Sequence, residues 1–149
     1  MTTDTSTPAV PTSDAATAPP PQVWPTFAAR DARALIAFLV EAFGFEETAV
    51  YGDGQTVAHA ELAWPPGGGV MLGSAREGDD CGPVPPGAFT CYAVTDDPDG
   101  LHARAVAAGA QVVRPLAETG YGSREFAVRD PEGNVWNFGT YRGEPRRPR

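Results

Sequence analysis

Large apolar and small or polar side chains alternate near the end of the chain, in residues 123–129 and 135–141. The segment between them, Asp130 to Gly133, is typical of a tight turn, because Pro presets φ and Gly tolerates positive φ. This pattern predicts a β-hairpin with two unlike faces. The apolar face carries Phe126, Val128, Trp136 and Phe138, and the other carries Glu125, Ala127, Arg129, Val135, Asn137 and Gly139. We expect function on the second face.

Helical spacing of apolar residues occurs in two earlier segments, Asp31 to Gly44 and Asp97 to Gly109. Each Asp is placed to cap a helix by accepting hydrogen bonds from free backbone N–H groups. Each Gly is placed to end that helix in the left-handed conformation. The apolar stripes are Leu35, Phe38, Leu39 and Ala42 in the first helix, and Leu101, Ala105 and Ala108 in the second.

The elements occur twice in the order strand, helix, strand, strand, strand. The expected strands are 24–29, 45–51, 56–64 and 70–74, then 89–95, 110–114 and the final hairpin. The distance from the terminal Gly to the turn Gly is 24 residues in both halves, Gly44 to Gly68 and Gly109 to Gly133. Two copies of one unit explain this agreement. We therefore predict an α+β fold with a leader (1–22), two βαβββ modules (about 23–75 and 88–141) and a tail (142–149).

A sheet covered by one helix leaves its other face open. The faces that pack on the helices should carry Phe27, Ala29, Ala60, Leu62, Trp136 and Phe138. The open faces then carry Trp24, Thr26, His59, Glu61, Thr90, Tyr92, Asn137 and Arg129. Two such half-barrels facing each other would enclose a cleft of mixed aromatic and polar lining, which is the usual character of a small-molecule site.

Composition narrows the possible functions. The formal net charge of −8 disfavours binding to nucleic acid or to an anionic membrane surface. The chain contains no Lys, which excludes Schiff-base chemistry on a lysine amine. The leader is rich in Pro, Thr and Ala, so we expect it to be disordered, and it does not resemble a signal peptide. Cys81 and Cys91 without a secretory signal favour reduced thiols in the cytoplasm.

Residues 23–141 resemble the vicinal oxygen chelate superfamily, also called the glyoxalase/bleomycin-resistance/dioxygenase superfamily. The resemblance rests on the paired modules, the Asp130 to Gly133 turn, the ending from Asn134 to Tyr141, and the opening from Trp24 to Glu47. It implies a half-barrel cleft between two modules, and a homodimer, since members often build the cleft across one.

Metal enzymes of this superfamily carry ligands in the first and last strands of each module. The resemblance places these positions at Trp24, Leu72, Thr90 and Asn137. An indole and an isobutyl group cannot bind a divalent ion, and the two remaining groups, a hydroxyl and an amide, are a poor set of metal ligands. We therefore expect no metal and no cofactor. Antibiotic-sequestering members lack these ligands and stack flat ligands on aromatic side chains, which a Trp at a ligand position would suit.

Two groups of residues keep two interpretations each. His59 and Glu61 share a face of one strand and are either an acid–base pair or polar anchor in the cleft, or a half-exposed surface pair. Tyr121, in a Gly-Tyr-Gly loop, is either a lid or part of an ordinary connection. Arg124 and Arg129 either hold an anionic group or are surface charges.

The function that these features favour is metal-free, non-covalent binding of a small, partly aromatic molecule, of the antibiotic-resistance type, in the inter-module cleft. The predicted lining is Trp24, His59, Glu61, Thr90, Tyr92, Tyr121, Arg124 and Asn137. The alternative is a lyase, isomerase or dioxygenase, most plausibly metal-free with His59 and Glu61 as its catalytic pair. A structural or interaction module with an empty cleft is the third possibility. Neither nucleic acid nor a membrane is an expected partner.

Overall fold

The computed structural model describes residues 20–76 and 84–148. The first module comprises β1 (Thr26–Ala29), α1 (Ala32–Phe38), the π-helix η2 (Leu39–Phe43), β2 (Glu46–Tyr51), β3 (His59–Ala63) and β4 (Gly69–Ser74). The second comprises β5 (Thr90–Val94), α2 (Pro98–Ala107), β6 (Gln111–Glu118), β7 (Arg124–Arg129) and β8 (Val135–Gly139). Cys81 and nearly all of the leader lie outside the described residues.

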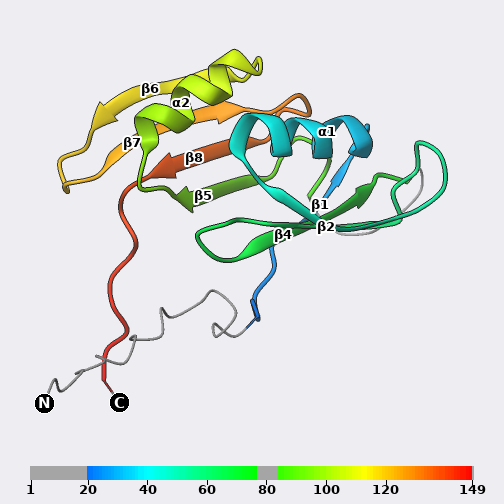
Figure 1. The fold of residues 1–149 in the computed structure, drawn as a ribbon, viewed down its shortest axis with the longest axis horizontal. Helices are drawn as coiled ribbons and strands as arrows, with labels where there is room; N and C mark the ends of the chain where they lie inside the picture. The colour runs from blue at the N-terminus through cyan, green and yellow to red at the C-terminus, as the bar shows by residue number, and fades with distance from the viewer. Residues whose placement is uncertain (1–19, 77–83, 149) are drawn as a thin grey trace, which may run out of the picture.

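Each module forms a four-stranded sheet with the same topology (Figure 1). The strand orders are β1-β4-β3-β2 and β5-β8-β7-β6. In each sheet the first and last strands of the module run parallel, and the remaining pairs are antiparallel. The predicted α+β fold with two βαβββ modules is therefore confirmed. In the described part of the chain, no helix is both long and apolar enough to cross a membrane.

The predicted helix caps are present. Asp31 Oδ1 accepts a hydrogen bond from the Ala34 backbone N–H at 3.1 Å, and Asp97 Oδ1 accepts one from the Gly100 N–H at 3.0 Å. Gly44 ends the first helical segment with φ 84°, in the left-handed region that its lack of a Cβ permits. Local sequence thus fixes where both helices begin.

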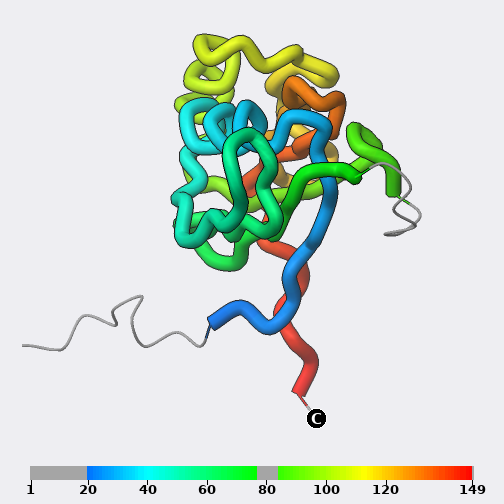
Figure 2. Tube along the Cα trace, turned by 90° about the vertical axis from the view of Figure 1, so that its right-hand side faces the viewer, coloured from blue at the N-terminus to red at the C-terminus, as the bar shows by residue number. Residues whose placement is uncertain are grey.

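The last turn of the first helical segment widens into η2, which the sequence did not predict. Arg104 on α2 reaches this turn from the second module, donating from Nε to the Glu41 carbonyl at 2.8 Å and from Nη2 to the Val40 carbonyl at 3.1 Å. Carbonyls at the end of a helix have no partner within it. The two modules therefore meet at their helices, which lie on the same side of the molecule in Figure 2.

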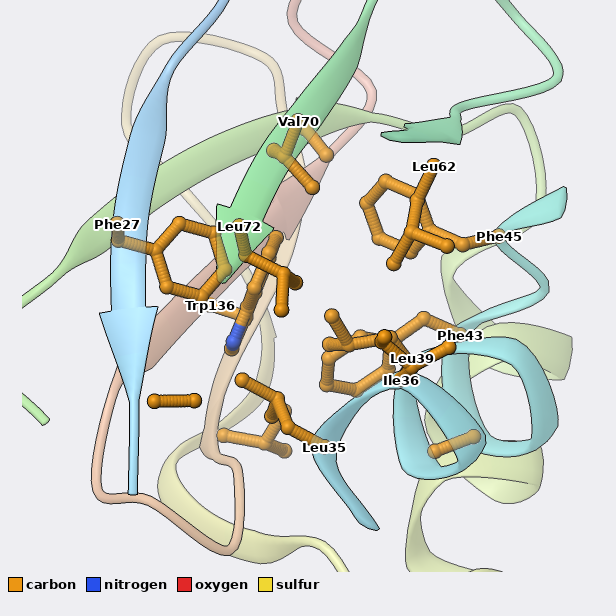
Figure 3. Close-up of a cluster of buried hydrophobic side chains, with 14 of the residues drawn as sticks. Phe27, Leu35, Ile36, Leu39, Phe43, Phe45, Leu62, Val70, Leu72 and Trp136 are labelled. Carbon is orange, nitrogen blue, oxygen red and sulfur yellow. The ribbon is translucent and has the colours of Figure 1, made fainter. Parts of the chain in front are cut away.

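The helix-facing sides of both sheets contribute to one hydrophobic core (Figure 3). Trp136 of β8 is fully buried and packs against Phe27 at 6.1 Å, Phe43 at 5.5 Å and Phe45 at 5.5 Å, all from the first module. These centroid distances are typical of favourable aromatic pairs. Because the apolar sides of both sheets are used in this core, the opposite sides of the sheets face outward.

A buried carboxylate organises the β7–β8 turn. Asp130 Oδ1 accepts from the Glu132 N–H at 2.9 Å and the Asn134 N–H at 3.1 Å. Its Oδ2 accepts from Asn134 Nδ2 and Trp136 Nε1, both at 2.8 Å. Several hydrogen bonds to one carboxylate offset the cost of removing it from water. The turn therefore holds the largest core side chain in place.

The same turn contacts the first module. The Glu132 carboxylate accepts hydrogen bonds from the backbone N–H of Arg30 and, at 3.2 Å, from that of Asp31. These residues directly precede α1, so a side chain of the second module satisfies backbone groups at the start of the first module's helix.

Candidate functional site

The outward face of the second sheet presents the small and polar side of the predicted hairpin. Tyr92 of β5 lies beside Asn137 of β8, and Glu125 of β7 lies beside Gly139 of β8. The intervening residues of these strands, such as Trp136 and Phe138, are fully buried in the core. The period-two pattern therefore places polar groups on the open face, as predicted.

A pocket of about 630 Å³ lies over this face. Three tyrosines, an amide, a guanidinium and two carboxylates line it: Tyr92, Arg114, Tyr121, Glu125, Asn137, Tyr141 and Glu144. These residues come from β5, β6, β7, β8, the β6–β7 loop and the segment after β8. Its size and its mixture of aromatic and polar groups are typical of small-molecule sites.

Glu125 is the buried charge of this pocket, with 6% of the residue exposed. Its Oε1 accepts a 2.6 Å hydrogen bond from the Tyr121 hydroxyl, and Arg114 Nη2 lies 3.8 Å from the same oxygen. Tyr121, whose loop could be either a lid or an ordinary connection, thus lies at the pocket and is hydrogen-bonded to this carboxylate.

Gly139 makes this arrangement possible. A Cβ at this position would lie 2.6 Å from Glu125 Cγ and 2.7 Å from the Tyr92 hydroxyl oxygen. Both distances are shorter than carbon and oxygen atoms tolerate without displacement. The absence of a side chain at Gly139 thus lets Glu125 and Tyr92 approach each other across β8.

The tyrosine hydroxyls are held in their protonated form. Burial raises the pKa of Tyr92, with a further contribution from the nearby Glu125 charge, and its hydroxyl donates to the Tyr141 carbonyl at 2.7 Å. The hydrogen bond to Glu125 raises the pKa of Tyr121. Near neutral pH both rings are therefore uncharged and can offer their π faces to a ligand.

Asn137 lies at the centre of the sheet's open face. Its Nδ2 donates to the Cys91 carbonyl at 3.1 Å and lies 3.4 Å from Thr90 Oγ1, and its Oδ1 accepts from Arg114 Nη2 at 3.3 Å. The amide is thus oriented by β5 on one side and β6 on the other. It links Thr90 to the pocket, although Thr90 does not line it.

The first sheet carries the remaining predicted residues on its own open face. His59 Nε2 lies 3.0 Å from Glu61 Oε1, and Tyr51 stacks on the His59 ring at 6.3 Å between centroids. Trp24 lies over Gly69 of β4 on this same face. The structure therefore divides the predicted lining: Trp24, His59 and Glu61 on one sheet, and Thr90, Tyr92, Tyr121 and Asn137 on the other. A single chain does not bring the two groups into one pocket.

Arg124 lies away from both groups. It forms a bidentate pair with Asp99 of α2, with both N–O distances 2.9 Å, and contacts Glu118 at 3.3 Å. This pairing lowers the pKa of Asp99. Arg124 therefore projects to the helix-covered side of the second sheet, and the expectation that it lines the cleft is corrected.

Leu72 also departs from its expected position. It is 3% exposed and packs in the core, as Figure 3 shows. Its neighbour Met71 pairs with Thr26 of β1 and lies on the open face of the sheet. The β6–β7 pair contains two register shifts and the β2–β3 pair only one. The second module therefore has one more bulged residue in β6 than the first module has in β2. This residue shifts the sequence correspondence between the two modules by one position, so Met71 corresponds to Asn137.

The ligand positions implied by the resemblance thus become Trp24, Met71, Thr90 and Asn137. A thioether is a soft ligand that suits neither Zn²⁺ nor Mg²⁺ in company with a hydroxyl and an amide. Within residues 20–76 and 84–148, no group of three or more His, Cys, Asp or Glu side chains is arranged to hold a metal ion.

Four lining residues were not among the predicted site residues: Arg114, Glu125, Tyr141 and Glu144. The alternation around the final turn already placed Glu125 on the polar face, which was a usable signal. Arg114 lies at the bulged part of β6, and Tyr141 and Glu144 follow the last strand, so no periodic pattern indicated them.

Comparison with known proteins identifies the fold family. The family model described as Glyoxalase/Bleomycin resistance protein/Dioxygenase superfamily matches residues 22–138. TioX from Micromonospora sp. ML1 is 31% identical, with a TM-score of 0.60 over 78% of this chain and 94% of that chain. TnmS3, an antibiotic binding protein from Streptomyces sp. CB03234, is 24% identical, with a TM-score of 0.60 over 76% of this chain and 88% of that chain.

A search of curated protein sequences found no match. The family match covers most of the chain, and the relative at 31% identity spans both modules. The chain therefore belongs to the glyoxalase/bleomycin resistance protein/dioxygenase superfamily.

Proposed function

We propose that this protein binds a small, partly aromatic molecule non-covalently in the pocket on its second sheet. The observation that carries the proposal is the pocket itself, in which Tyr92, Tyr121 and Tyr141 surround a buried carboxylate and an oriented amide. Tyr92 and Tyr121 are 41% and 63% exposed, so their rings are available to a ligand. Each good aromatic contact contributes about 1 kcal/mol beyond the area it buries.

The comparisons are consistent with this function. TnmS3 shares the fold and is an antibiotic binding protein, so the same two-module architecture can serve that purpose. We infer that ligand binding here needs no metal, because the residues at the ligand positions are an indole, a thioether, a hydroxyl and an amide.

We further propose that the protein acts as a homodimer. The open faces of its two sheets are separate within one chain, yet both carry aromatic and polar side chains. If the Trp24, His59 and Glu61 face of a second copy covered the Tyr92 and Asn137 face of the first, the predicted lining would be assembled across the interface. Sedimentation equilibrium would show the mass of two chains, and a mass of one chain would contradict this proposal.

The binding proposal is tested by thermal unfolding against a panel of flat, drug-like compounds, followed by calorimetric titration of those that raise the midpoint. Dose-dependent stabilisation supports binding, because a ligand that binds only the folded state raises its stability. The Asn137→Ala variant should lose most of the affinity, and Thr48→Ala, on exposed β2, is the control. Stoichiometric metal retained after growth with Zn, Ni, Mn or Fe would contradict the metal-free mechanism.

The alternative is an enzyme that uses His59 and Glu61, which the 3.0 Å contact between their side chains favours. A carboxylate at this distance can orient an imidazole for proton transfer. His59→Ala separates the two functions. An acid–base enzyme should lose on the order of a hundred-fold in rate, whereas a binding protein should lose only a few-fold in affinity.

A further inference from the structure

We propose that the pocket selects ligands that carry a positive charge next to their aromatic part, such as a protonated amine, and that Glu125 is the counter-ion for that charge. This inference rests on the proposed binding function and specifies the ligand class. It concerns the described pocket on the second sheet, lined by Tyr92, Arg114, Tyr121, Glu125, Asn137, Tyr141 and Glu144.

Glu125 is incompletely paired within the protein. A carboxylate whose side chain is only 7% exposed is costly to bury unless it is hydrogen-bonded and paired with a cation. The Tyr121 hydroxyl supplies one hydrogen bond, and Arg114 approaches no closer than 3.8 Å. Both groups approach Oε1. Oε2 lies beside Gly139 and near the Tyr92 hydroxyl, whose proton is already donated to the Tyr141 carbonyl, so a donor on the ligand can complete the pairing of the carboxylate.

Three tyrosines line the pocket around Glu125. A cation over the face of an aromatic ring is attracted by the ring's π electrons. Tyr92, Tyr121 and Tyr141 line the same pocket as Glu125, and tyrosine side chains are neutral near physiological pH, a state that their raised pKa values extend to more alkaline pH. A carboxylate beneath several neutral tyrosines therefore provides both a counter-ion and cation–π contacts for an aromatic amine.

The charged groups that line the pocket are unequal in sign. The lining contains two carboxylates, Glu125 and Glu144, and one guanidinium, Arg114. The Arg114 side chain is 53% exposed and already donates to Asn137 Oδ1, so much of its charge is solvated. An anionic ligand seated near Arg114 would also lie close to the desolvated Glu125 carboxylate, which would repel it. The charge balance therefore favours a cation.

The experiment uses three fluorescent probes that share one flat ring system: 9-(aminomethyl)anthracene, 9-anthracenemethanol and anthracene-9-carboxylate. The full-length protein is titrated with each probe, and the Kd values are compared. The amine should bind at least about tenfold more tightly than the alcohol, because a charge-assisted hydrogen bond is roughly twice as strong as a neutral one. The carboxylate should bind most weakly.

Variants then locate the discrimination. Glu125→Gln keeps the shape of the side chain but removes its charge, so the amine should lose about tenfold in affinity while the alcohol changes by less than about twofold. Glu46→Gln, at an exposed position of β2, changes the net charge equally and should alter neither Kd. Arg114→Gln should tighten the amine a few-fold, because it removes a competing cation. This exposed substitution serves as the test if Glu125→Gln does not fold.

The outcomes separate the two proposals. If the alcohol or the carboxylate binds as tightly as the amine, or if Glu125→Gln weakens all bound probes equally, charge selection is wrong while the binding function stands. If none of the probes binds and the drug-like panel gives no stabilisation, the proposed function fails and this inference fails with it.

Discussion

The two faces of the second sheet are built from alternate residues of the same strands, yet one face packs in the core and the other is open. On the covered face, Phe126, Trp136 and Phe138 are fully buried against the helices and the first module. On the open face, Tyr92 is 41% exposed, and the Glu125 carboxylate is buried among tyrosines with Arg114 Nη2 3.8 Å from its Oε1. The covered face minimises exposed apolar area, whereas the open face retains exposed aromatic area and an incompletely paired charge.

This difference shows that adjacent residues of one strand can serve different purposes, one contributing to stability in the core and the next lining the pocket. Trp136 and Asn137 are neighbours in sequence, but their side chains lie on opposite sides of β8. The comparison fails if substitutions on the open face destabilise the protein as much as those on the covered face.

Trp136→Ala should cost about 3–5 kcal/mol in the free energy of unfolding, because it leaves a cavity where both modules meet. Asn137→Ala, one residue later, should cost less than about 1.5 kcal/mol, the typical net contribution of a hydrogen bond. Urea denaturation of both variants measures the difference. Equal losses would contradict the division of the sheet into two faces.

Asp130→Ala should cost about 2–4 kcal/mol, because it removes the acceptor for two backbone N–H groups, the Asn134 amide and the Trp136 indole. Glu144→Ala removes an exposed carboxylate of the pocket rim and is the control. We expect the Asp130 variant to lower the denaturation midpoint and the Glu144 variant to leave it unchanged. A stable Asp130 variant would show that the turn does not hold Trp136 in place.

Gly139→Ala should cost about 1–3 kcal/mol in stability and reduce ligand affinity at least about tenfold. The new methyl group would displace Glu125 and the Tyr92 hydroxyl, both of which line the pocket. Gly120→Ala is the matched control, because a Cβ there meets no atom within 4 Å. Calorimetric titration with a confirmed ligand, together with urea denaturation, would measure both effects. An unchanged Kd for Gly139→Ala would exclude these two side chains from the site.

Arg124→Gln should have the smallest effect, because its ion pairs with Asp99 and Glu118 are solvent-exposed. The pKa of Asp99 is lowered by Arg124, so this contribution is present above pH 3.8 and is lost as the pH falls through the folded-state pKa. Comparing the thermal midpoints of variant and wild type near neutral pH and below pH 3.8 tests this. Ligand affinity should not change, since Arg124 projects to the helix-covered side.

The sequence was sufficient for the features that depend on local chemistry. Asp31 and Asp97 cap their helices as predicted because a carboxylate three residues before a free N–H is all the motif requires. The alternation around Asp130 to Gly133 correctly separated Trp136 and Phe138 from Asn137, because strand side chains point to opposite faces with a period of two.

The errors arose where the period of two is interrupted. One additional bulged residue in β6 shifted the correspondence between the modules, which assigned Leu72 to the open face in place of Met71. With the bulge taken into account, the outward-facing counterpart of His59 in the second module is Glu125. Counting residues between glycines cannot detect a bulge, because the bulge changes which side each following residue faces without changing the order of elements.

The contact between the Glu132 carboxylate and the backbone before α1 makes the two modules unequal. The corresponding turn of the first module, Pro65 to Gly68, contains no acidic residue, so it has no carboxylate to accept hydrogen bonds from the backbone before α2. The two βαβββ modules are therefore not interchangeable in this contact. A fragment that ends at residue 76 would lack the partner for its own helix start, and grafting the second half of a relative without this glutamate would leave the same backbone groups unpartnered.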